Sequence, residues 1–335
     1  MVLFISIPSN PGPLLKSGPF FVPMKPPPPT SAYPAGNALT TFLIVAASSI
    51  FFCTKGVFVK LAYGGNADAI SVLALRMGFA FPVFVLMGWW HRGKEPLALT
   101  KKDWARMIGL GFFGYYLSSY MNFTGLRYIS VGMERVTLYT YPGLVLLGQA
   151  LLYRKRISRP VMIAALVSYL GIVCAFLGEA HAKSDRWQDL ALGTGLVFTS
   201  AVTYAVFILV SGQTVQRLGA ARFTSCVVGV SCVFVLWHFC LTRPVGSLLQ
   251  FPAPVYGYGL ILAIFGTVIP SYLLGLGLQR ASAQKFAVIS TVGPVVTLLL
   301  AWAVLHEPLR PVQLLGFFLS LAGGVTISFL KEKES

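Results

Sequence analysis

The sequence is dominated by a succession of apolar runs, each about 20 residues long, that starts near residue 39 and continues almost to the end. A helix needs about 20 apolar residues to cross the roughly 30 Å hydrocarbon core of a bilayer. The connections between the runs are short, so consecutive helices must be antiparallel neighbours. Ten spans are predicted, at 39–61, 68–90, 105–124, 130–152, 159–178, 190–211, 220–242, 254–277, 284–305 and 311–330.

Composition excludes a water-soluble globule. Of the 335 residues, 56% are hydrophobic and only 11% are charged, whereas ordinary soluble domains carry roughly a quarter charged residues. No connection is long enough for an extramembrane domain. We therefore expect an all-α integral membrane protein whose function lies within the bilayer.

The formal net charge of +16 would suggest a nucleic-acid partner in a soluble protein, but here it follows topology. With the N-terminus inside, 17 of the 26 lysines and arginines lie on the cytoplasmic side, five lie on the opposite side, and four lie within or at the ends of spans. Basic residues accumulate in cytoplasmic loops. The bias predicts ten spans with both termini cytoplasmic, and it leaves no support for a nucleic-acid partner.

Two terminal segments and the cysteines carry no expected function. Residues 1–38 are rich in proline and resemble a disordered tail with Met24 as an alternative start, and residues 331–335 form a short cytoplasmic tail. The cysteines lie in apolar runs without the spacing of a zinc site or a disulfide framework. No metal is expected, and the thiols should pack as small hydrophobes.

The chain repeats itself at a shift of 152 residues. Without a gap, the shift carries residues of spans 3–5 onto identical residues of spans 8–10, including Phe113-Gly114 onto Phe265-Gly266, Ser119-Tyr120 onto Ser271-Tyr272, Gly125-Leu126 onto Gly277-Leu278, and Pro142 onto Pro294. Each copy has five helices, an odd number, so the second copy enters the membrane from the opposite side. Such inverted repeats are common in secondary transporters, which bind substrate near the midplane where the copies meet. An inverted-repeat channel or a structural membrane subunit remains the alternative.

Several strings resemble the EamA-like branch of the drug/metabolite transporter superfamily. They are Thr54-Lys55-Gly56 with Lys60-Leu61-Ala62-Tyr63, Leu75-Arg76-Met77, Glu134-Arg135 with Leu138-Tyr139-Thr140-Tyr141-Pro142, and His306-Glu307-Pro308-Leu309. The resemblance covers about residues 39–330 and implies two EamA-like repeats, 39–178 and 190–330. It also implies a permease of the cell inner (plasma) membrane, often an exporter of amino acids or other metabolites, without a bound cofactor or an ATP-binding domain.

The sequence departs from the family pattern at two places. Many members have Trp-Gly-Ser-Asn where this chain has Phe52-Cys53-Thr54-Lys55, so a charge replaces a neutral polar group. The first copy has Arg154-Lys155 where the second has His306-Glu307, although the family often shows an acid in both.

Lys55 is the sharpest candidate for a functional residue. It lies about two-thirds of the way along the first span, where a lysine costs roughly 2.5–3.5 kcal/mol on insertion scales. It must face a polar cavity or a partner, or lose its proton. We expect it either to bind an anionic group of a substrate, such as a carboxylate, or to pair with Glu134 and hold helices together.

Three further ionisable residues fall within spans. Arg76 can attract substrate or take part in gating, or it can extend its guanidinium to the interface. Glu134 lies near the N-terminus of span 4, where the helix dipole favours a carboxylate, and it is also a candidate for proton coupling or for pairing with Lys55. Adjacent residues of a helix point in different directions, so Glu134 and Arg135 are not expected to pair.

Hydroxyl groups and helix breaks complete the expected substrate site. Polar side chains of spans 3, 4, 8 and 9 are candidates for the cavity lining: Tyr120, Tyr139, Tyr141, Tyr272 and Thr291. Pro142 and Pro294 occupy matching points of the two copies, and a matched pair of helix breaks indicates a binding region with hinges.

Taken together, these features predict ATP-independent, alternating-access transport of a small carboxylate-bearing metabolite or amino acid. The expected partners are that substrate, the lipid bilayer and a coupling proton or ion, with the chain acting as a monomer or homodimer. An intramembrane acyl- or lipid-modifying enzyme is the rival class. It would need a nucleophile and a base at one depth, and the sequence offers only His306 and Glu307, so we expect no catalytic activity.

Overall fold

The computed structural model describes residues 38–91, 100–153, 159–182, 186–281, 286, 289–290, 293–307 and 311–330. Within these residues every regular element is a helix and no strand occurs. The expected all-α membrane fold is therefore confirmed. Most of the N-terminal tail, the C-terminal tail and Thr291 lie outside the described residues.

The first five spans are formed by seven α-helices and one π-helix. Their bounds are α1 Ala38–Gly64, α2 Ala69–Trp90, α3 Lys101–Gly109, the π-helix η3 Leu110–Leu117, α4 Ser118–Gly125, α5 Val131–Leu138, α6 Tyr141–Tyr153 and α7 Arg159–Ala182. Span 3 is thus the continuous run of α3, η3 and α4, and span 4 is divided into α5 and α6.

The second five spans follow the same order. Their bounds are α8 Trp187–Leu218, α9 Ala220–Thr242, the 3₁₀-helix η5 Val245–Leu249, α10 Ala253–Ala263, the π-helix η6 Ile264–Val268, α11 Ile269–Arg280, α13 Gly293–Leu305 and α14 Pro311–Leu330. Five helical segments of the described chain are long and apolar enough, each taken alone, to cross a membrane.

Short polar residues set the helix starts at the membrane surfaces. The Asp68 side chain accepts from the backbone N–H of Ser71 at 2.9 Å and caps α2, and Ser130 accepts from Met133 N–H at 3.1 Å and caps α5. Such caps satisfy backbone donors that a helix start leaves without partners. Asp68 and Ser130 therefore fix where α2 and α5 begin.

The two π-helices lie at matching positions of the two copies. The 152-residue shift carries η6 onto residues 112–116, which lie within η3. A π-helix adds a residue to a turn, and such segments are often found at functional sites. Here they carry Tyr115 and Thr267, which occupy equivalent positions beside the centre of the molecule.

Contacts between side chains and glycines recur at the same 152-residue shift. A Cβ placed on Gly277 would lie 2.9 Å from Val45, and one placed on the equivalent Gly125 would lie 2.7 Å from the equivalent Val197. Glycine is needed at both positions because it lets the two copies approach closely. The inverted repeat therefore extends from the sequence to the contacts between helices.

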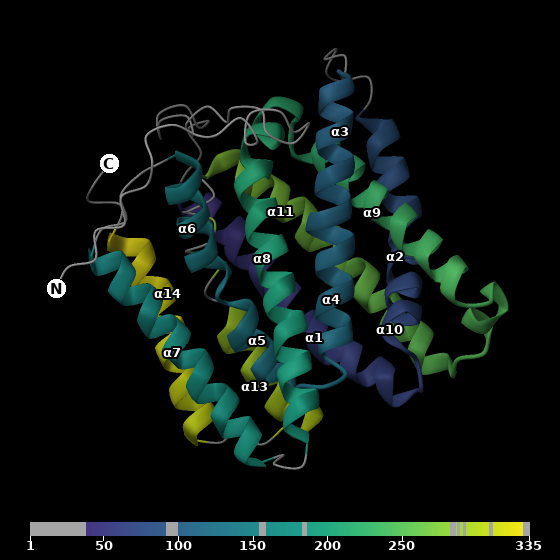
Figure 1. Ribbon diagram of the computed structural model, residues 1–335. Helices are drawn as coiled ribbons and strands as arrows, with labels where there is room; N and C mark the ends of the chain where they lie inside the picture. Colours follow the sequence, from purple (N-terminus) through teal and green to yellow (C-terminus); the bar gives the residue numbers. More distant parts are fainter. Residues whose placement is uncertain are drawn as a thin grey trace, which may run out of the picture.

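The central helices of each copy pack against helices of the other copy. Helix α1 of the first copy packs against α11 and α13 of the second, and the equivalent helix α8 packs against α4 and α6 of the first. Helices α2 and α9 pack together, and α7 lies along α14 at one side of the bundle (Figure 1). Each central helix is thus surrounded by the opposite copy.

Candidate functional site

A cavity lies at the centre of the bundle, beside the break in span 4 and the start of α13 in span 9. Its volume is about 60 Å³. Side chains of both copies line it: Ser49, Phe52, Cys53, Lys55, Arg76, Gly114, Tyr115, Ser118, Ser119, Arg135, Leu138, Tyr139, Tyr141, Ser200, Tyr204 and Ser290. We call it the central cavity. Its described lining contains three cationic side chains and no carboxylate.

The break in span 4 coincides with the predicted hinge proline. Helix α5 ends at Leu138, two turn residues follow, and α6 starts at Tyr141 with Pro142 as its second residue. Proline is tolerated in a first helical turn because its missing N–H has no partner there. Helix α13 starts at Gly293, so Pro294 has the equivalent place in span 9.

Hydrogen bonds from two hydroxyl groups join α1 and the break in span 4 to Ser290 of span 9. The side chains of Ser49 and Tyr139 both donate to the backbone carbonyl of Ser290, Ser49 at 2.5 Å, and the two hydroxyl oxygens lie 3.2 Å apart. A Cβ on Gly293 would collide with Cys53 Sγ and Ser49 Oγ. Span 9 therefore approaches α1 as closely as a glycine allows.

Lys55 lines the cavity from α1 and forms no hydrogen bond or ion pair with a described residue. Glu134, the expected partner, pairs elsewhere. The ammonium group therefore has its polar surroundings in the cavity rather than in a neighbouring carboxylate.

Arg76 reaches the cavity from α2 with 2% of its surface exposed. Its Nε donates to Thr267 Oγ1 at 2.5 Å, and its guanidinium lies 5.2 Å from the centre of the Phe123 ring. Its Nη1 has no hydrogen-bond partner among the described residues. Arg76 is thus fixed in the interior, not extended to the membrane surface, and keeps a free donor.

Glu134 and Arg135 do pair, which corrects the expectation that adjacent residues cannot. Arg135 Nε lies 2.8 Å from Glu134 Oε2, without the alignment of a hydrogen bond. The arginine guanidinium also reaches α1, where Nη2 donates to the Phe52 carbonyl at 3.4 Å and Nη1 to Cys53 Sγ at 3.8 Å. Asn122 Nδ2 of α4 donates to the other carboxylate oxygen at 2.7 Å. The Glu134 carboxylate is therefore held behind the cavity by two buried side chains.

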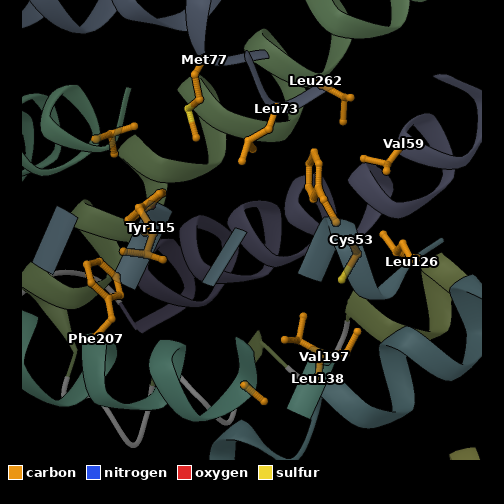
Figure 2. Close-up of a cluster of buried hydrophobic side chains, with 14 of the residues drawn as sticks. Cys53, Val59, Leu73, Met77, Tyr115, Leu126, Leu138, Val197, Phe207 and Leu262 are labelled. Carbon is orange, nitrogen blue, oxygen red and sulfur yellow. The ribbon is translucent and has the colours of Figure 1, made fainter. Parts of the chain in front are cut away.

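Aromatic side chains close one side of the cavity. Tyr115 and Phe207 meet edge to face with ring centres 5.2 Å apart, and Figure 2 shows them together at the same side of the buried cluster. Tyr204 stacks beside Phe207 and meets Tyr141 edge to face at 5.2 Å. Tyr115 also donates its hydroxyl to Ser271 Oγ at 3.0 Å. These contacts fix the hydroxyl-bearing rings relative to both copies.

The structure brings together only part of the predicted site. Lys55, Arg76, Tyr139 and Tyr141 line the cavity, and Glu134 lies directly behind it. Tyr120 instead packs against His238, with ring centres 4.8 Å apart, and Tyr272 is not part of the lining. Thr291 lies outside the described residues.

Other lining residues were missed as candidates. Arg135 carried a signal, because it is a charge within a span, but it was treated only as a neighbour of Glu134. Ser49, Ser200 and Ser290 gave none, because serine is common in membrane helices and only the tertiary structure shows which serines face a cavity. No group of three metal-ligating side chains occurs among the described residues.

A separate contact joins the copies away from the cavity. The carboxylate of Glu307, just after α13, accepts from the backbone N–H groups of Val131 at 3.0 Å and Gly132 at 3.3 Å. A carboxylate at a helix N-terminus is favoured by the exposed N–H groups and the dipole. Glu307, which the sequence offered as part of a rival enzyme site, therefore fastens the start of α5.

Comparisons with known proteins agree with this architecture. The EamA-like transporter family matches residues 39–177 and again residues 191–329. The uncharacterized transporter YcbK of Bacillus subtilis (strain 168) is 28% identical over 280 residues, covering 83% of this chain and 88% of the relative. The threonine/homoserine exporter RhtA of Escherichia coli (strain K12) is 25% identical over 281 residues, covering 80% and 85%.

A protein of known crystal structure has the same fold as this chain. It superposes with a TM-score of 0.65 over 89% of this chain and 100% of that chain, at 19% sequence identity.

Proposed function

Because this chain belongs to the EamA-like transporter family, we propose that it is an ATP-independent secondary transporter that exports or exchanges a small carboxylate-bearing metabolite by alternating access. One observation carries the proposal: the central cavity lies at the break in span 4 and beside the start of α13, and its described lining has three cationic side chains without a carboxylate. Inverted-repeat transporters bind substrate at such a point. An amino acid is the other candidate substrate, since the relative RhtA is named as a threonine/homoserine exporter.

In this mechanism Lys55 binds the substrate carboxylate and Arg76 supplies a second cationic contact. The hydroxyls of Tyr139, in the break of span 4, and of Ser49, in α1, hold the Ser290 carbonyl of span 9 while the cavity is closed. Rocking of the copies would separate these hydroxyls from the Ser290 carbonyl and open a path to one membrane face. Glu134 keeps Arg135 in place, and no catalytic step is assigned to any residue.

The charge distribution supports an orientation, and membership of the family supports a cell membrane. We propose that the protein lies in the cell inner (plasma) membrane with both termini cytoplasmic, and that residues 39–178 and 190–330 form the two repeats. A fluorescent protein fused to the C-terminus should be folded and bright, whereas a fused periplasmic phosphatase should be inactive. The opposite result would reverse the orientation.

The central test is flux after removal of the cavity ammonium. Lys55→Ala should abolish transport in reconstituted vesicles, at least 100-fold below the wild type, because a buried charge-assisted contact is lost. Lys60→Ala is the matched control, since Lys60 lies on the same helix and outside the cavity lining. Unchanged elution and melting temperature of the purified variant show that folding is intact.

Three outcomes separate this proposal from its rivals. Saturable counterflow of a labelled substrate indicates a carrier, and non-saturable flux indicates a channel. Undiminished transport by Lys55→Ala removes Lys55 from the mechanism. A proton or another ion as coupling species is tested by imposing a pH or sodium gradient across the same vesicles.

A further inference from the structure

We propose that the central cavity selects a small substrate with two negative charges on oxygen acids, such as a short dicarboxylate or a phosphate, over a zwitterionic amino acid. The inference rests on the proposed transport function and names its substrate class. It starts from the balance of charge around the cavity.

The lining cations are not equally compensated. The charge of Arg135 is balanced by Glu134 at 2.8 Å, and the second oxygen of that carboxylate is occupied by Asn122. Lys55 and Arg76 have no carboxylate partner among the described residues. Two basic side chains in the membrane interior thus remain without a carboxylate partner in the described part of the chain, and each in its charged form costs several kcal/mol unless a ligand or water compensates it.

Arg76 supplies the clearest sign of an absent ligand. It is 2% exposed, its Nε and ring face are used by Thr267 and Phe123, and its Nη1 is buried without a partner in the described part of the chain. A buried donor without a partner costs about 1–3 kcal/mol, more for a charged group. Because Arg76 lines the cavity, an anionic oxygen there would satisfy it.

Two helix ends add to the positive potential. Both α6, starting at Tyr141, and α13, starting at Gly293, have 13 residues and begin beside the cavity. Helix N-termini carry a partial positive charge and attract anions. The backbone carbonyl of Ser290, which would repel an anion, already accepts hydrogen bonds from the hydroxyls of Ser49 and Tyr139.

The ammonium group of an amino acid finds no matching acceptor. The remaining polar groups of the described lining are neutral hydroxyls, which accept a hydrogen bond without balancing a charge. Faces of the lining tyrosines attract cations only modestly, by about 0.5–2 kcal/mol, against repulsion by Lys55 and Arg76. The volume of about 60 Å³ corresponds to roughly four to six waters, so the ligand has few heavy atoms in this conformation.

The test measures binding and flux separately with the purified full-length protein. Calorimetric titration uses succinate and inorganic phosphate as the two dianion arms, lactate as the monoanion and threonine as the zwitterion. We expect at least one dianion to bind more than tenfold more tightly than lactate or threonine. Whichever of succinate and phosphate binds more tightly shows whether the preferred dianion is a dicarboxylate or a phosphate.

Two variants assign the selectivity to the cavity. Lys55→Gln and Arg76→Gln should each weaken binding of the preferred dianion by roughly 10- to 100-fold, and Arg76→Lys should restore part of the loss. Lys60→Gln and Arg280→Gln should leave it unchanged. Because Lys55 and Arg76 have no carboxylate partner to lose, the two neutral variants should melt no lower than the wild type without ligand.

The outcomes separate this inference from the transport proposal. Tighter binding of threonine or lactate, or binding of neither dianion, overturns the inference even if counterflow is observed. A dianion that binds but gives no counterflow keeps the site and overturns the transport function. A large fall in melting temperature for both neutral variants would mean that the two cations hold the fold instead.

Discussion

The two copies of the repeat place different residues at equivalent points around the cavity. The first copy has cations at three positions, Lys55, Arg76 and Arg135. At the positions that the 152-residue shift assigns to them, the second copy has Phe207, Val228 and Ala287. The backbone frame is nevertheless shared: Lys55 approaches Gly266, with its Cβ 3.5 Å from a Cβ placed there, and Phe207 packs on the equivalent Gly114.

This difference teaches how a symmetric frame holds an asymmetric ligand. The second copy uses its positions for packing, with Phe207 between aromatic rings, and contributes neutral oxygens such as those of Thr267 and Ser290. The first copy contributes the charges that face the cavity. Duplication therefore gives the two copies the same backbone frame. The substitutions within one copy set the chemistry of the site.

The largest effect on stability is expected where the first copy buries an ion pair. Arg135→Ala, which installs the residue found at position 287, should lower the free energy of unfolding by about 3–5 kcal/mol. The reason is that Glu134, with 0% exposed, then loses its counter-charge and keeps only Asn122. The measurement is unfolding by SDS titration in mixed micelles.

The double variant Glu134→Gln with Arg135→Ala is the control for that prediction. It removes both charges of the pair and keeps an acceptor for Asn122, so it should recover most of the lost stability. A single variant as stable as the wild type would contradict the assignment of the pair.

A smaller effect should separate the two equivalent glycines. A Cβ on Gly114 would lie 2.7 Å from the Cβ of Phe207, whereas a Cβ on Gly266 would have ordinary contacts at 3.5 Å. Gly114→Ala should cost about 1–3 kcal/mol through overpacking, and Gly266→Ala should stay within about 0.5 kcal/mol. Melting temperatures of the two variants test this directly. Equal losses would show that the copies are equally tight at this contact.

The smallest effect concerns an ion pair that joins the copies outside the membrane core. Asp68 accepts from Arg243 at 2.7 Å, and the matching positions hold Ala220 and His91. Burial alone would raise the pKa of Asp68, but hydrogen bonds from Ser71 and Arg243 hold this pKa below the ordinary value of 3.8. The stabilisation is therefore present above about pH 4 and is lost as pH falls through the lower folded pKa.

Asp68→Asn should cost about 0.2–1 kcal/mol at neutral pH, since Arg243 is 52% exposed and the pair is screened by solvent. The difference between the variant and the wild type should shrink as the pH falls below 3.8, because Asp68 is then increasingly protonated in the folded protein. Unfolding measured at pH 7 and at pH 3 tests this, and a difference that grows in acid would contradict the sign of the shift.

Part of the site could be predicted from the sequence because charges and prolines in a membrane span are rare and costly. Lys55 and Arg76 are candidates because of the cost of a charge in a span, and Pro142 is a candidate because Pro294 occupies the matching point of the second copy. The tyrosines could not be sorted in the same way, because a tyrosine in a membrane helix packs, anchors or lines a cavity at similar cost. Tyr139 and Tyr141 face the cavity while Tyr120 packs on His238, and only the helix rotations decide this.

The sequence by itself determined the apolar spans, the inverted duplication and the presence of uncompensated charge in the first copy. These depend on hydrophobic length, parity of the helix count and the insertion cost of ions, which need no coordinates. The tertiary structure alone decided which carboxylate neutralises which cation. Glu134 pairs with Arg135 rather than with Lys55, because hydrogen bonds to α1 hold the Arg135 guanidinium beside one carboxylate oxygen and Asn122 donates to the other. That pairing leaves Lys55 and Arg76 for the cavity.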